Sequence, residues 1–303
     1  MPGYHLPYFT AVAKRIFERH GLDVEIVYPE PGPDNVRAVA RGSYDFCLTS
    51  VAHFMRALTE DGALDARFVH VITPHTHMGV MFVPNRPTRG GKTIRDFSDL
   101  DGASFVGDSA SPFTREYLHL MRVLGLPDPP LVEVPYAQVK EALGAGEGDV
   151  TADFVDLLPD YRTAAEPSGH IVDALPFHRA GIDTYGSGLV AGNTLIETNV
   201  DLVRRLIAAI RAALEETRRD PLAGAGELIA RFPEAGLERT LASWRASESL
   251  IFPEDGAVGS GMEHDKWART IEHHALVHGS ARAQVDDVFA GSHLTDLEPS
   301  GPG

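Results

Sequence analysis

Residues 4–58 read YHLPYFTAVAKRIFERHGLDVEIVYPEPGPDNVRAVARGSYDFCLTSVAHFMRAL. The first residues predict a loop rich in aromatic side chains and proline, made of Tyr4, Pro7 and Tyr8. An amphipathic helix follows and ends at Gly21, because glycine commonly closes a helix. The alternating apolar and polar residues of 22–28 then predict a strand.

The second half of this stretch repeats the same alternation. A second helix ends near Gly42, and residues 44–48 predict a buried strand. Thr49 and Ser50 follow that strand and open a third helix. Two segments that could face a ligand therefore lie close together, namely the aromatic loop and a helix N-terminus with free N–H groups.

The rest of the chain continues as short strands and helices, and becomes helical near its end. Strands are predicted at 68–73, 80–83, 105–107, 131–134 and 150–154, with helices at 112–125 and 137–143. Long helical patterns then occupy 202–219, 223–231, 237–248 and 266–278. This alternation favours α/β domains with largely parallel sheets.

Composition restricts the function classes. The chain has 303 residues, of which 43% are hydrophobic, so it can bury a large core and form two domains. A formal net charge of -16 argues against binding nucleic acid or an anionic membrane surface. No apolar run approaches the roughly 18 residues that a membrane-spanning helix needs, so we expect no direct insertion. The single cysteine, Cys47, excludes a disulfide framework, and we expect it to be buried and inert.

Several motifs together resemble a known family. They are the segments 13–27 and 42–50, DFSDLDG at 96–102, GDSAS at 107–111 and GDVTADF at 148–154. The order of these motifs resembles type 2 periplasmic solute-binding proteins. The most similar branch binds thiamine-pyrimidine precursors, alkanesulfonates, taurine or nitrate.

The resemblance implies an α/β fold with two lobes, a ligand cleft between the lobes and a helical C-terminal part. Lobe I is expected to be discontinuous and to comprise residues 1–78 plus 187–303, with residues 79–186 forming lobe II. The implied function is that of the substrate-binding protein of an ABC-type transporter. Its partners would be a transporter permease and a small organic solute of the pyrimidine, sulfonate or aromatic carboxylate class, and no cofactor is implied.

A second reading is a cytoplasmic enzyme on the same fold, such as a decarboxylase, desulfinase, dehydratase or pyrimidine synthase. In that case His75 or His77 would act as the acid–base group and Ser109 would hold a substrate carboxylate. Residues 1–10 contain no basic segment and no apolar run typical of a secretory signal, which is compatible with a cytoplasmic protein. The resemblance instead implies a periplasmic or extracellular, membrane-associated location. We expect a binding protein rather than an enzyme.

The serine and threonine candidates are expected at helix N-termini. Thr49 and Ser50 open one helix, while Ser109 and Ser111 precede another, and all four could bind a ligand oxyanion together with free N–H groups. The alternative is that these hydroxyls simply cap their helices. The glycine at position 107 would let a ligand approach the backbone.

The remaining ligand-binding candidates are aromatic or titratable. Tyr8 could stack on a flat ligand. Tyr185, at the second crossover between the lobes, is a candidate for a role in the cleft, as Asp153 is. Asp153 lies on an apolar strand and could accept from an amino or ammonium group, or could be paired with an arginine. The aromatic loop and this acid together favour an amino-heterocycle.

The histidines form two local groups. His75 and His77 are two residues apart, so on an extended segment they would face the same way and could bind a ligand. The alternative is a turn, favoured by the proline at 74 and the glycine at 79, with both imidazoles in solvent. A metal is not expected there, because two histidines without a third ligand make a weak site. His273, His274 and His278 are expected on a solvated helix face, although the spacing from 274 to 278 could chelate zinc.

Overall fold

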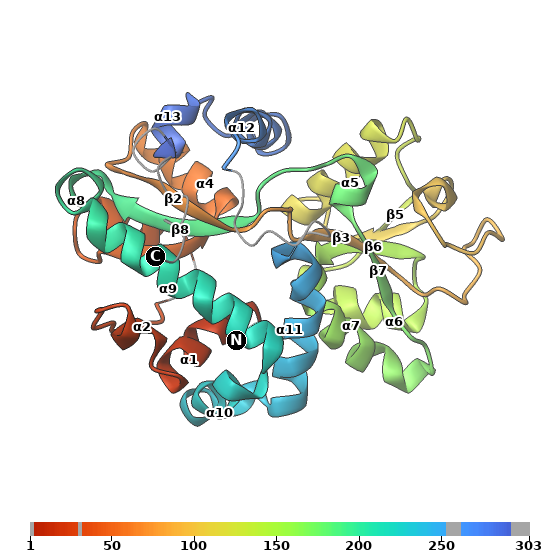
Figure 1. Cartoon of the computed structure of the whole chain (residues 1–303). Helices are drawn as coiled ribbons and strands as arrows, with labels where there is room; N and C mark the ends of the chain where they lie inside the picture. The colour runs from red at the N-terminus through yellow and green to blue at the C-terminus, as the bar shows by residue number, and fades with distance from the viewer. Residues whose placement is uncertain (1–2, 30–31, 253–261, 292–303) are drawn as a thin grey trace. The chain divides into compact units, whose positions relative to one another are not determined.

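The computed structural model describes residues 3–29, 32–252 and 262–291, and the chain forms two compact units (Figure 1). Unit 1 comprises Met1–Tyr4, Thr76–Asp183 and Ala235–Ser249, and unit 2 comprises His5–His75, Thr184–Glu234 and Leu250–Gly303. The sequence-based division into lobes, with boundaries after residues 78 and 186 and with 235–249 in the lobe that begins the chain, stays a prediction.

Unit 2 is built on a three-stranded sheet with the order β1-β8-β2. Both β1 (Phe46–Ser50) and β2 (Ala66–Thr73) pair antiparallel with β8 (Ser187–Gly192). The helices α3 (Pro33–Ala40) and α4 (Val51–Asp61) connect 22–28, β1 and β2 along the chain. The expected helix ending near Gly42 and the helix opened by Ser50 are both confirmed, since Gly42 has φ 71° and Ser50 caps α4.

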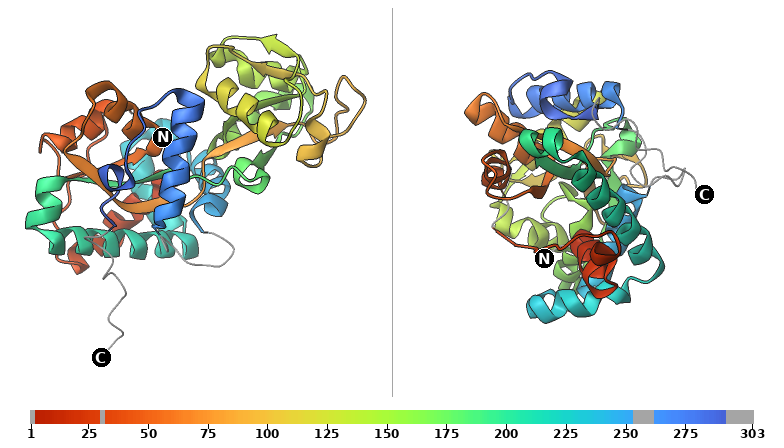
Figure 2. Two further views of the ribbon diagram at one scale, coloured as in Figure 1. Left: turned by 90° about the horizontal axis from the view of Figure 1, so that it is seen from above. Right: turned by 60° about the vertical axis from the view of Figure 1, so that its left-hand side comes forward.

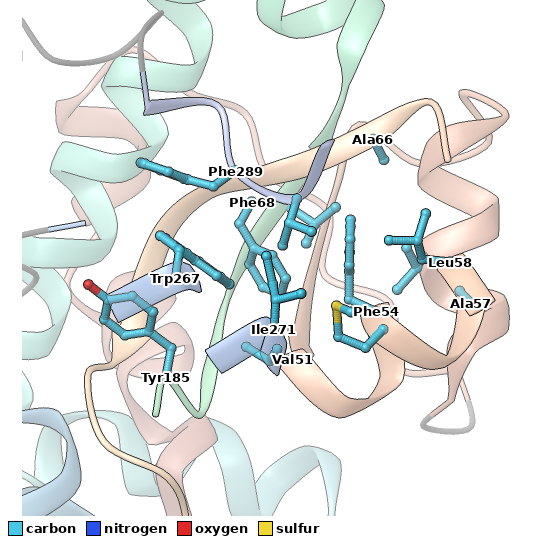
Figure 3. Packing of buried hydrophobic residues seen from close by; sticks show 14 of the residues in the cluster. Val51, Phe54, Ala57, Leu58, Ala66, Phe68, Tyr185, Trp267, Ile271 and Phe289 are labelled. Atoms are coloured by element: carbon cyan, nitrogen blue, oxygen red, sulfur yellow. The ribbon is translucent and has the colours of Figure 1, made fainter. Parts of the chain in front are cut away.

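A cluster of aromatic rings joins early and late segments of the chain in the core of unit 2 (Figure 3). The ring of Phe68 on β2 lies 4.9 Å from that of Phe54 on α4 and 5.1 Å from that of Trp267 on α12 (His264–His278). Phe289 stacks on Trp267 at 5.6 Å, just after α13 (Val285–Val288). These rings are buried, so the last described helices are held to the sheet by hydrophobic burial.

The N-terminal segment differs from its prediction. After the short 3-10 helix Gly3–His5, helix α1 spans Leu6–Ala13, so Pro7 and Tyr8 belong to its first turn rather than to a loop. Proline is well tolerated in a first turn because its missing N–H has no partner there. Arg15 has φ 51°, in the left-handed region, and this breaks the expected single helix into α1 and α2 (Ile16–Arg19).

Helix α1 packs against the long helix α9 (Val200–Arg219) and against α10 (Leu222–Arg231), as Figure 1 and the right-hand view of Figure 2 show. The Thr217 hydroxyl donates to the Thr10 hydroxyl at 2.8 Å between α9 and α1. Gly224 is needed on α10, because a Cβ there would come within 2.5 Å of the Thr10 backbone nitrogen. The helix α8 (Asn193–Thr198) links β8 to α9.

The strand predicted at 22–28 is not formed. The segment is not helical and belongs to no sheet among the described residues. Its alternating pattern is nevertheless reflected in burial, since Leu22, Val24, Ile26 and Tyr28 are more buried than Asp23, Glu25 and Val27. A strand needs a hydrogen-bonded neighbour as well as a pattern, and the described residues supply none here.

Unit 1 contains a five-stranded sheet with the order β5-β4-β6-β3-β7. Its strands are β3 (Met78–Phe82), β4 (Phe105–Gly107), β5 (Leu131–Glu133), β6 (Val150–Phe154) and β7 (Asp173–Pro176). The expected largely parallel sheet is only partly correct, because β4 is parallel to β5 and β6 while β3 is antiparallel to β6 and β7.

Both faces of this sheet are covered. Val80 and Phe82 of β3 pack with Tyr117 and Leu120 of α5 (Pro112–Val123). Met81 and Val83 pack in a second cluster with residues of α6 (Val139–Ala145) and α7 (Leu158–Ala165). Alternate side chains of a strand point to opposite faces, so one strand contributes to two cores.

Most of helix α11 (Leu237–Ile251) belongs to unit 1. Arg239 on α11 donates two hydrogen bonds to the Asp160 carboxylate on α7, at 2.8 and 3.0 Å. Trp244 of the same helix is fully buried. A sequence pattern predicts the helix but does not show which core its buried face enters.

The remaining short 3-10 helices are Phe97–Leu100, Tyr136–Gln138, Val155–Leu157, Glu166–Ser168, Phe177–Ala180 and Pro233–Ala235. Within the described ranges, no helix has the length and apolar character needed to cross a membrane.

The prediction of a solvated histidine face on α12 is wrong for two of its three members. His273 is 9% exposed and His274 is 7% exposed. His274 lies seven residues after Trp267 and three after Ile271, so the helical repeat places it on the buried side of α12.

Candidate functional site

Three parallel strands of unit 1 have their carboxyl ends on the same side of the sheet, and this side is called the carboxyl edge, or simply the edge, below. Because β4 is parallel to both β5 and β6, their carboxyl ends at Gly107, Glu133 and Phe154 lie on one side. Ligands of open α/β sheets bind outside the carboxyl ends of the strands. The residues at and after these ends therefore form the candidate site.

Asp153 is the central polar residue of this edge. Its side chain is 0% exposed, and its carboxylate accepts hydrogen bonds from the Tyr161 hydroxyl at 2.8 Å and the Phe154 N–H at 2.8 Å. The Tyr136 hydroxyl lies 3.2 and 3.3 Å from the two carboxylate oxygens. Among the described residues, the Asp153 carboxylate is thus paired with tyrosine hydroxyls and a backbone N–H, and no arginine donates to it.

The electrostatics of this group follow from its burial. Burial raises the pKa of the Asp153 carboxyl above its ordinary value, although the three donors and the charge of Lys140 act to lower it. Burial and the neighbouring Asp153 charge raise the pKa of both the Tyr136 and the Tyr161 hydroxyls. Both tyrosines therefore remain protonated donors at neutral pH, and they hold the carboxylate in place.

An exposed group of aromatic rings lies beside Asp153. The Phe113 ring, at the start of α5, stacks on the Tyr136 ring at 5.2 Å with an interplanar angle of 14°. The Phe154 ring meets Phe113 edge-on at 5.2 Å. Tyr136 is 42% exposed and Phe154 is 39% exposed, so this aromatic patch (Phe113, Tyr136 and Phe154) offers ring surface for stacking.

His77 lies on the segment that leads into β3 and is 9% exposed. Its Nδ1 lies 3.6 Å from a carboxylate oxygen of Asp156, which is 3% exposed. The His77 ring meets those of Tyr4 and Phe154 edge-on, at 5.7 and 5.9 Å. Burial raises the pKa of the Tyr4 hydroxyl, and the Asp156 charge raises it further. The site thus combines two buried carboxyl groups, one imidazole and several rings.

The predicted serines at this edge are engaged in local hydrogen bonds. The Ser109 N–H and hydroxyl both donate to the Glu133 carboxylate, at 3.0 and 3.2 Å. The Ser111 hydroxyl caps α5 by accepting from the Phe113 N–H at 3.2 Å. Gly107 does not leave space for a ligand, because a Cβ there would lie 2.5 Å from the Phe105 ring and 3.0 Å from the Thr114 hydroxyl.

The remaining candidates, Tyr8, Thr49, Ser50, His75 and Tyr185, belong to unit 2. Ser50 is the N-cap of α4 and accepts from the His53 N–H at 3.2 Å, while Thr49 is 7% exposed on β1. Tyr8 is half-buried in α1, with the His5 ring at 6.4 Å. His75 is half-buried in a bent segment rather than an extended one, so the argument that it faces the same way as His77 does not hold.

Tyr185 lies in the core of unit 2 (Figure 3). It is 2% exposed, its ring lies 4.8 Å from that of Trp267, and its hydroxyl accepts from the Glu263 N–H at 2.8 Å. These contacts favour a structural role. A ligand contact by Tyr185 stays a prediction, as it does for the other candidates.

Unit 2 also has a groove of about 810 Å³ between 23–28, α1 and α10. Tyr28 at this groove stacks on Phe9 at 5.7 Å, and the Arg231 guanidinium lies 5.1 Å from the Tyr28 ring centre. Burial raises the pKa of Tyr28 to about 12, against a smaller opposing effect of Arg231. The aromatic and cationic groups there are already in contact with each other.

Sequence reasoning missed five residues of the candidate site: Phe113, Tyr136, Phe154, Asp156 and Tyr161. The signal that could have found Tyr136 is its position three residues after the end of β5, as carboxyl ends of parallel strands gather at one edge. Within unit 1, no three described His, Cys, Asp or Glu side chains bring their ligand atoms close enough to share a metal ion.

One known protein family matches most of the chain. The model of the family described as "NMT1/THI5 like" matches residues 3–223. The chain belongs to this family. No curated protein matches it.

Solved structures with the same fold are distant in sequence. The aliphatic sulphonate-binding protein of Escherichia coli aligns with a TM-score of 0.70 at 18% identity, covering 97% of this chain and 96% of that one. A putative periplasmic sulfonate-binding protein of Methylobacillus flagellatus gives 0.67 at 15% identity, covering 97% and 90%. The desulfurization enzyme DszB gives 0.57 at 15% identity, covering 96% and 95%. The expected periplasmic binding protein fold is thereby confirmed, and at these identities the likeness concerns the fold alone.

Proposed function

We propose that this protein is the solute-binding component of an ABC-type importer and that it captures a flat amino-heterocycle such as an aminopyrimidine. Membership of the NMT1/THI5-like family supports the general role. The periplasmic sulfonate-binding proteins that share the fold support a periplasmic location and a transporter permease as partner.

The observation that carries the ligand class is the aromatic patch next to the buried Asp153. The Tyr136 and Phe154 rings are about 40% exposed and suit a flat ligand, because an aromatic surface gains contact area at low entropic cost. Asp153 acts as a positioning residue, since it holds the Tyr136 hydroxyl and so fixes the exposed ring.

The charges around the patch favour a nitrogen heterocycle over a sulfonate or a carboxylate. Asp108, Glu133, Asp153 and Asp156 all lie on the strand ends of this edge or on the turns that follow them. Ser109, which could have bound an anion, already donates both of its hydrogen bonds to Glu133. An anionic ligand would meet these carboxylates, whereas an amino group would be attracted to them.

A thermal-shift titration of the purified chain tests this proposal, with aminopyrimidines, thiamine, alkanesulfonates, nitrate and aromatic carboxylates as probes. Mass spectrometry of each mixture then shows whether the probe is unchanged. We expect an aminopyrimidine to raise the melting temperature, because stabilisation grows with ligand excess over Kd. Stabilisation by sulfonates alone would contradict the proposed ligand class.

Two variants locate the site. Tyr136→Ala should weaken aminopyrimidine binding about tenfold or more, the loss expected for a stacking contact of roughly 1–3 kcal/mol. Tyr44→Ala is the matched control, because Tyr44 is also a surface tyrosine, with 38% exposure against 42% for Tyr136. Equal affinities of both variants would show that the ligand binds elsewhere.

An enzymatic function is the second candidate, and the buried pair of His77 and Asp156 is the observation that favours it. An imidazole 3.6 Å from a buried carboxylate is suited to acid–base chemistry, and a desulfurization enzyme shares the fold. Consumption of any probe in the mass-spectrometric assay, and its loss in His77→Ala, would favour this candidate over the binding protein.

A further inference from the structure

Helix α12 ends in a group of three histidines, called the α12 histidine cluster below: His273, His274 and His278. All three belong to unit 2, whereas the residues of the candidate site belong to unit 1. His273 and His274 are almost fully buried, and His278, the last residue of the helix, is half-buried. The proposed function does not involve this cluster.

The pattern of burial at this end of α12 is the reverse of the usual one. Trp267 and Ile271 form the buried stripe of the helix, and the helical repeat continues this stripe through His274 to His278. Leu276, in the same turn, is 70% exposed. A leucine is normally buried in preference to an imidazole. The helix therefore carries imidazoles where packing alone would favour an apolar side chain, which indicates a use for them beyond packing.

The three imidazoles are spaced for one shared ion. The ring centres of His274 lie 5.5 Å from those of His278 and 5.6 Å from those of His273. The His273 and His278 ring centres are 6.5 Å apart, and a nitrogen of one ring lies within 4.8 Å of a nitrogen of the other. Two imidazoles on one tetrahedral zinc ion, each with a Zn–N distance of about 2.0–2.1 Å, have ring centres roughly 5 Å apart. Small side-chain rotations are therefore enough to bring all three rings to one ion.

The end of the helix also favours a cation. The helix closes at His278, with Gly279 as its C-cap. The aligned peptide dipoles place a partial negative charge at this C-terminus, which attracts positive ions and repels anions. The formal net charge of the whole chain is -16, so the long-range field acts in the same direction.

The ligand atoms select the kind of ion. Imidazole nitrogen suits zinc, copper and nickel, whereas magnesium and calcium prefer oxygen ligands. Zinc takes four ligands in a tetrahedral arrangement, so three histidines leave one position open. A site of this kind holds a water molecule or a small ligand in the fourth position, unlike the closed sites that serve structure alone.

We propose that His273, His274 and His278 bind one Zn²⁺ ion at the C-terminal end of α12, with water or a small ligand in the fourth position. Binding draws the His273 and His278 rings together and holds the last turn of the helix. Because the folded helix brings the three imidazoles together, the ion stabilises the native state over the unfolded one.

Titration of the full chain with zinc chloride tests the proposal, with the protein purified without a histidine tag. Competition with a chromophoric chelator gives the stoichiometry and the Kd. We expect one equivalent to bind with a Kd on the order of 1 µM, and the melting temperature to rise with zinc excess over Kd. Binding only with a Kd above about 100 µM would show an adventitious ion only and would overturn the proposal.

Variants of single histidines locate the ion. His278→Ala changes a half-buried residue and should weaken zinc binding at least tenfold, because even the loss of a group that only supports a metal ligand costs about 10–100-fold. His264→Ala is the matched control, since His264 lies at the other end of the same helix with its side chain 70% exposed. It should bind zinc as the wild type does. Wild-type affinity in a His278→Ala variant that circular dichroism shows to be folded would refute the site.

X-ray absorption of the zinc-loaded chain identifies the ligand atoms. We expect a shell of nitrogen or oxygen atoms at about 2.0–2.1 Å with the scattering pattern of imidazole rings. A sulfur atom at about 2.3 Å would assign the ion to Cys47, the only cysteine of the chain, and would contradict the proposal. Loss of binding in His77→Ala, with His278→Ala unaffected, would contradict it as well, because the ion would then belong to unit 1.

Discussion

Asp153 shows how one residue can organise a surface without being exposed itself. Its carboxylate is fully buried, yet its hydrogen bonds fix Tyr136, whose ring is 42% exposed. Isolated burial of a carboxylate is unfavourable, and the donors of Tyr136, Tyr161 and Phe154 offset part of that cost. The remaining cost is visible as the raised pKa of Asp153.

The first prediction concerns the pH dependence of stability in Asp153→Asn. Because the folded pKa of Asp153 is raised, the folded state holds the proton more tightly than the unfolded state. The contribution of Asp153 to the free energy of unfolding therefore falls as the pH rises from about 3.9 through the folded pKa. Urea unfolding at a series of pH values should show the variant gaining stability relative to wild type across this window.

Asp160→Asn should behave in the opposite way. Burial acts to raise the pKa of Asp160, but hydrogen bonds and charges from Arg239 and Lys140 outweigh it and lower the pKa. That stabilisation is present above the unfolded pKa and is lost as the pH falls through the lowered one. The same slope in both variants would contradict the assignment for Asp153.

At the scale of elements, helix ends explain two of the four predicted hydroxyl residues. Ser50 and Ser111 each accept a hydrogen bond from a backbone N–H of the helix that they open. An N-cap satisfies one of the donors that a helix leaves without an intrahelical partner. The predicted oxyanion contacts at these residues stay untested.

The second prediction is that Ser111→Ala and Ser50→Ala each lower the free energy of unfolding by about 1 kcal/mol, the usual value of an N-cap. Ser109→Ala is the control, since Ser109 is exposed and its change should stay within about 0.5 kcal/mol. Denaturant unfolding measures all three. Equal effects of Ser109→Ala and Ser111→Ala would argue against the capping role.

The third prediction concerns the break between α1 and α2. Arg15 has φ 51°, which costs a residue with a Cβ roughly 1–2 kcal/mol relative to the right-handed region. Arg15→Gly should therefore raise the free energy of unfolding by about 0.5 kcal/mol after the entropic cost of glycine. Arg122→Gly, at an exposed helical position in α5, should instead lower it by about 1 kcal/mol. A loss of stability in Arg15→Gly would be the contrary result.

At the scale of the whole molecule, residues from distant parts of the chain complete each unit. Trp267 and Phe289 from the C-terminal part enter the core of unit 2, and α11 supplies Arg239 to Asp160 in unit 1. Each unit is therefore discontinuous, and its stability depends on segments far apart in sequence.

The fourth prediction follows from this arrangement. Phe289→Ala should lower the free energy of unfolding by about 3–5 kcal/mol, the range for a buried phenylalanine. Phe289 is 6% exposed and stacks on Trp267, whereas Leu276 on α12 is 70% exposed. Leu276→Ala should change stability by no more than about 0.5 kcal/mol in the same thermal or denaturant experiment. Similar losses in both variants would show that Phe289 is not a core residue.

Local patterns in the sequence were sufficient for most elements and for the fold class. The glycine at 42, the serine before α4 and the proline at 112 act within a few residues, so helices and their ends can be read without knowing the partners. The motifs also carried the family resemblance, since residues 3–223 match the NMT1/THI5-like family.

Pairing and burial were decided only by the tertiary structure. Residues 22–28 have a strand pattern but no ladder, and the predicted parallel sheets contain antiparallel strands, because both properties depend on a neighbour. The same holds for the site: Asp153 could be singled out from its apolar strand, but Tyr136 and Tyr161 bind it only after folding. A hydrogen bond between residues far apart in the chain leaves no periodic trace in the sequence, and this is why contacts had to come from the structure.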